Sequence, residues 1–165
     1  MILQLFKKTK ELDLERTYRA PIGTVWDAWT KPEMLQQWWG PEKTSVPECR
    51  IDLAVGGEIH IVMEAGPEMG KYQGTRWPMA GVFTRIEQPS RLTYDARSWT
   101  EGEEEGSTIH HTNDVQLTES DGATTVKLHV TITQIGPKAK MAAFGMKWGY
   151  KAQLDKLEKL LAAQR

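Results

Sequence analysis

Four polar side chains stand at positions of the sequence where a core residue would be expected: Arg16, Tyr94, His111 and Asn113. In each case the residue lies in a segment where every second position is otherwise apolar, and it occupies one of those positions. Each is therefore predicted to point to the inner face of a sheet. Two interpretations are open. These groups can satisfy one another's hydrogen bonds, or they can line a pocket, because ligand cavities combine apolar walls with a few polar groups. In a pocket, His111 could transfer protons as a general acid or base.

Other residue types that support catalysis or metal binding do not occur in the required patterns. His110 and His111 are adjacent, so on a strand they point to opposite faces, and neither His60 nor His129 has a ligand at helical or turn spacing. The segment 66–71 is one residue short of a Walker loop. There is no G-x-S-x-G motif around a serine. We therefore expect no metal ion and no cofactor, and the sequence assigns no catalytic residue.

The elements that must position the polar residues follow from periodicity. Alternating apolar residues predict strands at 11–19, 44–54, 58–65, 81–87, 91–99, 107–118 and 124–133. Two short helices, the first with Pro21 in its first turn and the second closed by Gly40-Pro41, are expected between the first two strands. We expect segment 66–79 to be a Gly- and Pro-rich connection, and the strand at 81–87 to contain a bulge. This order predicts an α+β fold with an antiparallel sheet.

A long helix opened by Gly136-Pro137 completes the chain. One stripe of this helix is predicted to lie on the sheet: Ala143, Met146, Tyr150, Leu154, Leu157 and Leu161. A second apolar group, Met141, Phe144 and Trp148, lies away from that stripe. We expect this group to contact something besides the sheet, and one possibility is a homodimer built on it.

Length and composition fit one globular domain of ordinary type. The chain has 165 residues, a formal net charge of −1, 39% hydrophobic residues and 26% charged residues. Because nucleic-acid binding requires a clustered basic surface, the near-neutral balance argues against a nucleic-acid partner. Tryptophan is unusually frequent, with 7 Trp against 4 Tyr and 3 Phe. Four of the tryptophans fall in the two predicted short helices.

The N-terminus does not have the pattern of a secretory signal, because the charged Lys7 and Lys8 follow a short apolar run instead of preceding a long one. No segment is long and apolar enough to insert into a membrane as a spanning helix. Cys49 is the single cysteine, which fits a buried thiol in a reducing compartment. These features predict a cytoplasmic protein with an N-terminal extension over 1–10 and a single domain over 11–165.

Several motifs together resemble the family of activator of heat-shock protein 90 ATPase homologues, which belongs to the START-like, helix-grip superfamily of polyketide cyclases and birch-pollen-allergen-like proteins. The resemblance covers about residues 11 to 163. The residues that carry it are Leu14-Glu-Arg-Thr-Tyr-Arg-Ala-Pro21, Val25-Trp26, Trp29-Thr-Lys-Pro-Glu33, Trp38-Trp-Gly-Pro41, Asp52 with Gly56-Gly57, Gly81-Val-Phe-Thr-Arg-Ile86, Pro89-Ser-Arg-Leu92 and Gly149-Tyr150 with Leu154 and Leu157.

The resemblance implies a curved antiparallel sheet of about seven strands that grips the C-terminal helix on its concave face, with a cavity between them. Combined with the inward polar residues, it leads to one main hypothesis: a small hydrophobic molecule, a lipid or an aromatic compound, binds in this cavity. The candidate ligand-binding residues are Arg16, Trp39, Met63, Trp77, Tyr94, His111, Asn113, Phe144, Met146 and Tyr150.

Two alternative functions remain. One is a protein-interaction module of the co-chaperone type, with a chaperone partner and a role in the stress response, although the additional N-terminal domain of the co-chaperone that gives the family its name is missing from this sequence. The other is an enzyme of cyclase or dehydratase type with His111 as the proton-transfer group. The balance of the sequence features favours binding over catalysis. The oligomeric state, monomer or homodimer, stays open at this level.

Overall fold

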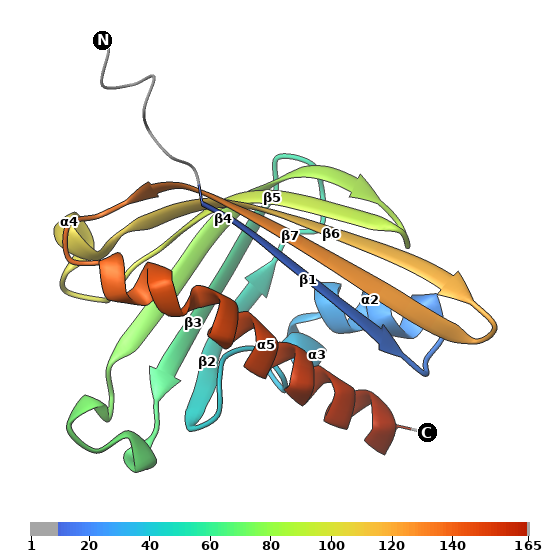
Figure 1. Cartoon of the computed structure of the whole chain (residues 1–165), viewed down its shortest axis with the longest axis horizontal. Helices are drawn as coiled ribbons and strands as arrows, with labels where there is room; N and C mark the ends of the chain where they lie inside the picture. Colours follow the sequence, from blue (N-terminus) through green and yellow to red (C-terminus); the bar gives the residue numbers. More distant parts are fainter. Residues whose placement is uncertain (1–9, 165) are drawn as a thin grey trace, which may run out of the picture.

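The computed structural model describes residues 10–164 as seven strands and a set of helices, most of them short. Figure 1 shows how these elements are arranged. In chain order they are β1 (Lys10–Tyr18), α2 (Ile22–Thr30), α3 (Pro32–Leu35), β2 (Thr44–Ile51), β3 (Glu58–Ala65), a 3₁₀ helix (Pro67–Tyr72), β4 (Arg76–Glu87), β5 (Arg91–Ser98), α4 (Glu104–Ser107), β6 (Ile109–Ser120), β7 (Ala123–Ile135) and α5 (Lys140–Ala163).

All seven strands form one curved antiparallel sheet, in the order β1-β7-β6-β5-β4-β3-β2 (Figure 1). Strands that follow one another in the sequence are neighbours, except that β1 pairs with β7, with Leu14 opposite Leu128. The hairpin between β6 and β7 turns at Asp121 and Gly122, which both have positive φ, as a two-residue hairpin turn requires. The predicted α+β helix-grip fold is confirmed.

Helices α2 and α3 are short, and large rings hold them together. The rings of Trp29 and Trp38 meet edge to face, with centroids 4.8 Å apart. The indole nitrogen of Trp38 donates a hydrogen bond to the carbonyl oxygen of Ala28 at 2.9 Å. Trp26 and Trp29 of α2 and Trp38, which follows α3, are all buried, so these tryptophans form part of the core.

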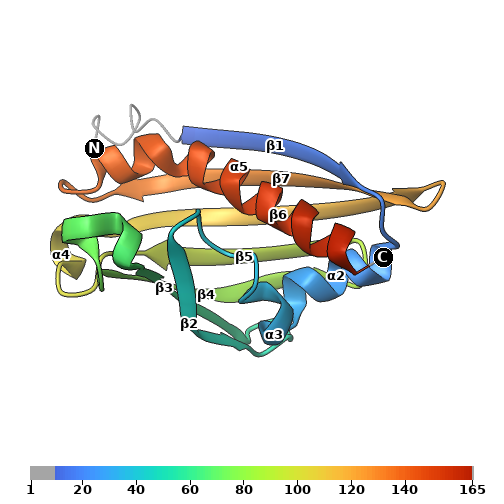
Figure 2. The same ribbon diagram turned by 90° about the horizontal axis from the view of Figure 1, so that it is seen from below.

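Helix α5 lies across the concave face of the sheet, with α2 and α3 near its C-terminal half (Figure 2). Several hydrogen bonds hold it there: among them, the hydroxyl of Tyr18 donates to the carbonyl of Leu154 at 3.1 Å, and the backbone N–H of Gly40 donates to Oε1 of Gln153 at 3.0 Å. The predicted stripe is buried except for Met146, which is half-buried. Within residues 10–164, no helix is long and apolar enough to span a membrane.

The main difference from the sequence prediction concerns β4, which begins at Arg76 and not near Gly81. The segment 66–79, predicted to be a connection, therefore contains the first residues of a strand. Pro78 lacks an N–H group, but its carbonyl accepts a hydrogen bond from the N–H of Trp99 at 3.1 Å. The predicted bulge is confirmed, because the β4–β5 register shifts between Phe83 and Arg85.

The other differences lie at element ends. Helix α5 starts at Lys140, because residues 136–138 are hydrogen-bonded to the chain before β6: the N–H of Gly136 donates to the carbonyl of Thr108, and that of Lys138 to the carbonyl of Gly106, both at 2.8 Å. These bonds replace a first helical turn. The segment between β5 and β6 contains the single helical turn α4.

Candidate functional site

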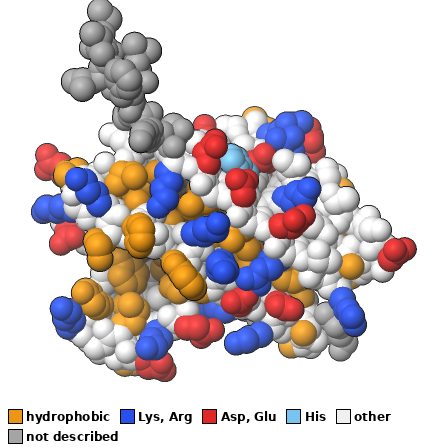
Figure 3. All heavy atoms as spheres, in the orientation of Figure 1, with side chains coloured by type: hydrophobic (Ala, Val, Ile, Leu, Met, Phe, Trp, Pro, Cys, Tyr) orange, Lys and Arg blue, Asp and Glu red, His pale blue; other side chains and the backbone are white. Residues whose placement is uncertain are grey.

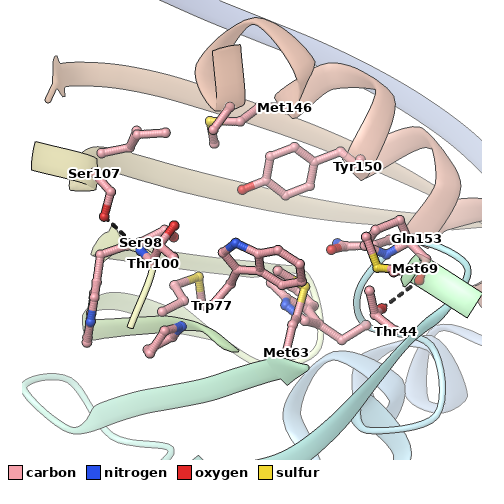
Figure 4. A pocket seen from close by; sticks show the side chains of 18 residues that line it. Thr44, Met63, Met69, Trp77, Ser98, Thr100, Ser107, Met146, Tyr150 and Gln153 are labelled. Atoms are coloured by element: carbon pink, nitrogen blue, oxygen red, sulfur yellow. Dashed lines mark hydrogen bonds between the residues drawn. The ribbon is translucent and has the colours of Figure 1, made fainter. Parts of the chain in front are cut away.

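A cavity of about 420 Å³ lies between α5 and the sheet, as Figure 4 shows from close by. Its size falls within the range of small-molecule sites. The apolar lining residues are Trp39, Pro41, Met63, Met69, Trp77, Pro78, Met79, Trp99, Ile109, Ala142, Met146 and Gly149. The polar lining residues are Thr44, Ser98, Thr100, Ser107, Tyr150 and Gln153.

Strand register and helix periodicity bring these residues together. Met63 on β3 is paired with Trp77 on β4, so the two side chains stand on the same face of the sheet. On α5, Met146, Tyr150 and Gln153 are spaced four and three residues apart, which places them on one face of the helix. In Figure 4 Trp77 and Met63 lie opposite Met146 and Tyr150 across the cavity.

The lining carries no charged side chain among the described residues. Several of its polar atoms are already engaged within the protein. Oγ1 of Thr44 donates to the carbonyl of Pro41 at 2.6 Å, Oγ of Ser107 accepts from the N–H of Thr100 at 2.8 Å, and Oε1 of Gln153 accepts from the N–H of Gly40. The wall is therefore neutral and mainly apolar.

A chain of four buried or half-buried polar residues runs behind the wall and reaches the cavity at both ends. The hydroxyl of Tyr150 donates to Oδ1 of Asn113 at 2.9 Å, and Nδ2 of Asn113 lies 2.7 Å from Nδ1 of His111. Nε2 of His111 lies 2.9 Å from Oγ of Ser98. Tyr150 and Ser98 line the cavity, whereas His111 and Asn113 are fully enclosed between them.

Burial shifts the pKa values of the two titratable residues in this hydrogen-bonded chain, His111 and Tyr150. It lowers the pKa of His111 to about 4, so the imidazole is neutral at pH 7. Burial also raises the pKa of Tyr150 well above the usual range, so its hydroxyl stays protonated. The chain is thus a set of neutral hydrogen-bonding groups.

Five of the ten sequence-predicted ligand residues line the cavity: Trp39, Met63, Trp77, Met146 and Tyr150. His111 and Asn113 stand directly behind the wall and are linked to it through Ser98 and Tyr150. For His111 and Asn113 the structure therefore agrees with the first interpretation, mutual hydrogen bonding, because neither of them lines the cavity itself.

The remaining three predicted residues do not line the cavity. Arg16 forms an ion pair with Asp155 on the C-terminal half of α5. Tyr94 is buried and packs edge to face against Phe83, with centroids 6.0 Å apart. Phe144 is 77% exposed, and the ammonium group of Lys10 lies 5.5 Å from its ring centroid.

Sequence reasoning missed the serines and threonines of the wall and Gln153. Ser98 and Thr100 flank the end of β5, where the alternation of the strand stops and gives no signal. Gln153 had a usable signal, because it is a polar residue three positions after Tyr150 and next to Leu154 in the buried stripe of α5.

Residues 10–164 give little support for a metal site or a reactive thiol. No group of three His, Cys, Asp or Glu residues there is arranged to hold a metal ion. Burial and the nearby Glu33 raise the pKa of the Cys49 thiol to about 11, so this thiol is protonated at neutral pH and a weak nucleophile.

An exposed apolar patch, consisting of Met141, Phe144 and Trp148, lies on the solvent side of α5. Figure 3 shows hydrophobic side chains gathered on this face of the molecule, around the N-terminal half of α5. The ammonium group of Lys151 lies 5.3 Å from the ring of Trp148. A homodimer with this patch as its interface remains a prediction from the sequence.

Comparison with known proteins agrees with this architecture. A protein from Nitrosomonas europaea has a solved structure that matches with a TM-score of 0.72 and 25% identity, over 93% of this chain and 95% of that chain. The AHSA1 protein from Silicibacter pomeroyi matches with a TM-score of 0.68 and 24% identity, over 94% of this chain and 100% of that chain. A protein from Mycobacterium smegmatis shares the fold with a TM-score of 0.73 and 20% identity, over 93% of this chain and 95% of that chain.

The search of curated proteins gave no significant match. The family model described as activator of Hsp90 ATPase homolog 1-like protein matches residues 19–162, which include strands β2 to β7, both short helices and most of α5, but not β1. The match spans the large majority of the sequence and agrees with the observed fold. The chain therefore belongs to the family of activator of Hsp90 ATPase homolog 1-like proteins.

Proposed function

We propose that this protein binds a small, neutral, hydrophobic molecule in the cavity between α5 and the sheet. The observation that carries the proposal is the composition of the wall, which combines four methionines and three tryptophans with no charged side chain in the described residues. Burying an apolar ligand there removes apolar surface from water on both sides, which is favourable by roughly 25 cal/mol per Å². A charged ligand would lose its hydration without gaining an ion pair.

The wall is also suited to more than one ligand shape. Met63, Met69, Met79 and Met146 have flexible, polarisable side chains that adapt to irregular surfaces. Trp39, Trp77 and Trp99 supply flat faces for stacking. This combination favours aromatic or lipid-like molecules.

A matched pair of tryptophan variants tests the proposal. Trp77 lines the cavity, whereas Trp148 is 73% exposed on the opposite side of α5, so the same substitution has different consequences at the two positions. Affinities for a panel of fatty acids, sterols and aromatic polyketides are measured by equilibrium dialysis, and native mass spectrometry of the purified protein reports any ligand retained from the cell.

We expect Trp77→Ala to weaken binding of the best ligand by about tenfold or more, because a large apolar contact is lost, and Trp148→Ala to leave binding unchanged. Thermal unfolding of both variants reports whether they fold. If no member of the panel binds and the purified protein carries no ligand, or if both variants lose affinity equally, the proposal is wrong.

The family match supports a second candidate function, a protein-interaction module that acts on a chaperone ATPase. The family description names activators of the Hsp90 ATPase, and the match over residues 19–162 is the observation that favours this candidate. It predicts that the purified protein binds the chaperone and raises its ATP hydrolysis rate. A steady-state ATPase assay without any stimulation would exclude the activity.

A further inference from the structure

Two polar side chains of the cavity wall, Ser107 and Gln153, share one property: the oxygen of each accepts a hydrogen bond from a backbone N–H of the protein. Oγ of Ser107 accepts from the N–H of Thr100 at 2.8 Å, and Oε1 of Gln153 accepts from the N–H of Gly40 at 3.0 Å. A hydroxyl or a primary amide that is held in this way keeps its own hydrogens for another partner. Figure 4 shows Ser107 and Ser98 near one end of the cavity and Gln153 near the other.

The buried chain behind the wall gives Ser98 the same property, because its direction is fixed at each step. Oδ1 of Asn113 can only accept, so it takes the hydrogen of the Tyr150 hydroxyl. Nδ2 of Asn113 can only donate, so Nδ1 of His111, 2.7 Å away, is the acceptor and carries no hydrogen. The hydrogen of the neutral imidazole is therefore on Nε2.

Nε2–H of His111 then donates to Oγ of Ser98 at 2.9 Å. The hydroxyl hydrogen of Ser98 is not used by this chain, and no other described residue accepts it. Since Ser98 lines the cavity, its hydroxyl is able to donate to a molecule inside.

From the fixed direction of these hydrogen bonds we infer that Ser98 selects hydrophobic molecules that carry a hydrogen-bond acceptor, foremost a carbonyl oxygen. This inference rests on the proposed function, that the cavity binds ligands. A ketone or quinone oxygen can accept a hydrogen bond from the Ser98 hydroxyl. It carries no hydrogen-bond donor that would need an acceptor in the cavity wall. Ser107 and Gln153 offer further donors of the same kind. The ligand class is thus a neutral carbonyl compound with an apolar skeleton.

The same geometry bears on catalysis. His111 donates to Ser98 and does not accept its hydrogen, so in this arrangement the imidazole is not a base that activates the Ser98 hydroxyl. It acts as a positioning residue that orients a binding hydroxyl.

The test uses two probes, fluorene and 9-fluorenone, which share a tricyclic skeleton and differ in a CH₂ group against a carbonyl group. Their dissociation constants are measured by equilibrium dialysis for the full chain and its variants. We expect Ser98→Ala to weaken binding of 9-fluorenone by about tenfold, the value of one hydrogen bond, and to leave fluorene binding unchanged. Comparing each probe between two proteins cancels the different water solubilities of the probes.

Two further variants complete the design. Thr44→Val is the matched control, because it removes a lining hydroxyl whose hydrogen is already taken by the carbonyl of Pro41, and it should not discriminate between the probes. Ser98→Thr keeps the hydroxyl and should retain 9-fluorenone affinity. Should Ser98→Ala not fold, Ser98→Cys gives the same comparison, because a thiol is a weak donor of similar size.

The outcomes separate this inference from the proposed function. Equal effects of Ser98→Ala on the two probes, or no effect on either, overturn the inference while binding itself stands. Binding of neither probe by the wild-type protein contradicts both the inference and the proposal that the cavity accepts small aromatic molecules.

Discussion

At the residue scale, His111 shows how a buried strand position changes the chemistry of a side chain. It lies on the inner face of β6, is 2% exposed, and makes hydrogen bonds through both ring nitrogens. Desolvation lowers its pKa to about 4 because the charged form loses its hydration, and the repulsion of the nearby His110 acts in the same direction.

This shift predicts a pH dependence of stability. In the unfolded chain His111 has the ordinary histidine pKa of 6.5, whereas the native protein resists protonation down to about pH 4. Stability contributed by the neutral imidazole is therefore complete above pH 6.5 and is lost as the pH falls from 6.5 to about 4. The loss amounts to about 3 kcal/mol at most. Urea unfolding at several pH values should show a smaller acid slope for His111→Gln than for the wild-type protein.

His129 provides a control with the opposite sign. Its hydrogen bond to Asp13 raises its pKa, so its contribution is present at low pH and is lost as the pH rises through the raised value. His129→Gln should therefore steepen, or leave unchanged, the loss of stability on acidification. A parallel acid slope in wild type and His111→Gln would contradict the assigned burial of His111.

Arg16 shows why alternation alone misplaced a candidate ligand residue. Its parity on β1 correctly indicates the face that carries α5, but β1 is an edge strand of the sheet. A side chain at that position meets the C-terminal half of α5 and solvent, where it pairs with Asp155. Alternation predicts the face of a strand and not its distance from the cavity.

A conservative substitution tests that placement. Arg16→Gln removes the ion pair with Asp155, whose side chain is 58% exposed. Since exposed pairs contribute about 1 kcal/mol or less, we expect a small decrease in the free energy of unfolding and no change in ligand affinity. A large loss of 9-fluorenone binding in this variant would show that Arg16 belongs to the site.

At the element scale, α5 carries both the buried stripe and one wall of the cavity, and it contains two glycines. Gly145 and Gly149 are helical, and a Cβ added to either would have no neighbour within 4 Å. Glycine costs a helix about 0.5–1 kcal/mol relative to alanine. Of the two, Gly149 lines the cavity and Gly145 does not.

The two positions predict separable effects of one substitution. Gly145→Ala should raise the free energy of unfolding by about 0.5–1 kcal/mol without changing ligand affinity. Gly149→Ala should stabilise the helix by a similar amount, but its methyl group enters the edge of the cavity and should alter the affinity for fluorene. Chemical unfolding and equilibrium dialysis measure the two effects. Altered fluorene binding in Gly145→Ala alone would contradict the position of the cavity.

The start of β4 illustrates the limits of local sequence signals. The segment before Gly81 contains Pro67, Pro78 and several glycines, which locally favour turns. Its last five residues, 76–80, nevertheless belong to the strand despite Pro78, because residues 76–82 pair with β3 over nearly its whole length. Tertiary pairing outweighed local propensity there, and as a result Trp77 stands on a strand and not in a loop.

At the scale of the whole molecule, element order and family resemblance were enough to predict the fold, because alternating strands and one amphipathic helix have few ways to bury their apolar faces. The cavity was harder to predict in detail. Its wall combines residues from every strand except β1 and β7, from α4, α5 and the 3₁₀ helix, and from the segments that follow α3 and β5. Their proximity depends on how α5 lies across the sheet, which periodicity does not specify.

The central claim, that a hydrophobic molecule occupies the space between α5 and the sheet, is tested most directly by NMR of the ¹³C-labelled methionine methyl groups during titration with 9-fluorenone. Met63, Met69, Met79 and Met146 line the cavity, whereas Met34 and Met141 lie outside it and serve as internal controls. We predict saturable shifts of the four lining methyl resonances, with the two control resonances unmoved. Unchanged lining resonances at saturating probe, or shifts confined to Met141 on the exposed patch, would contradict the account.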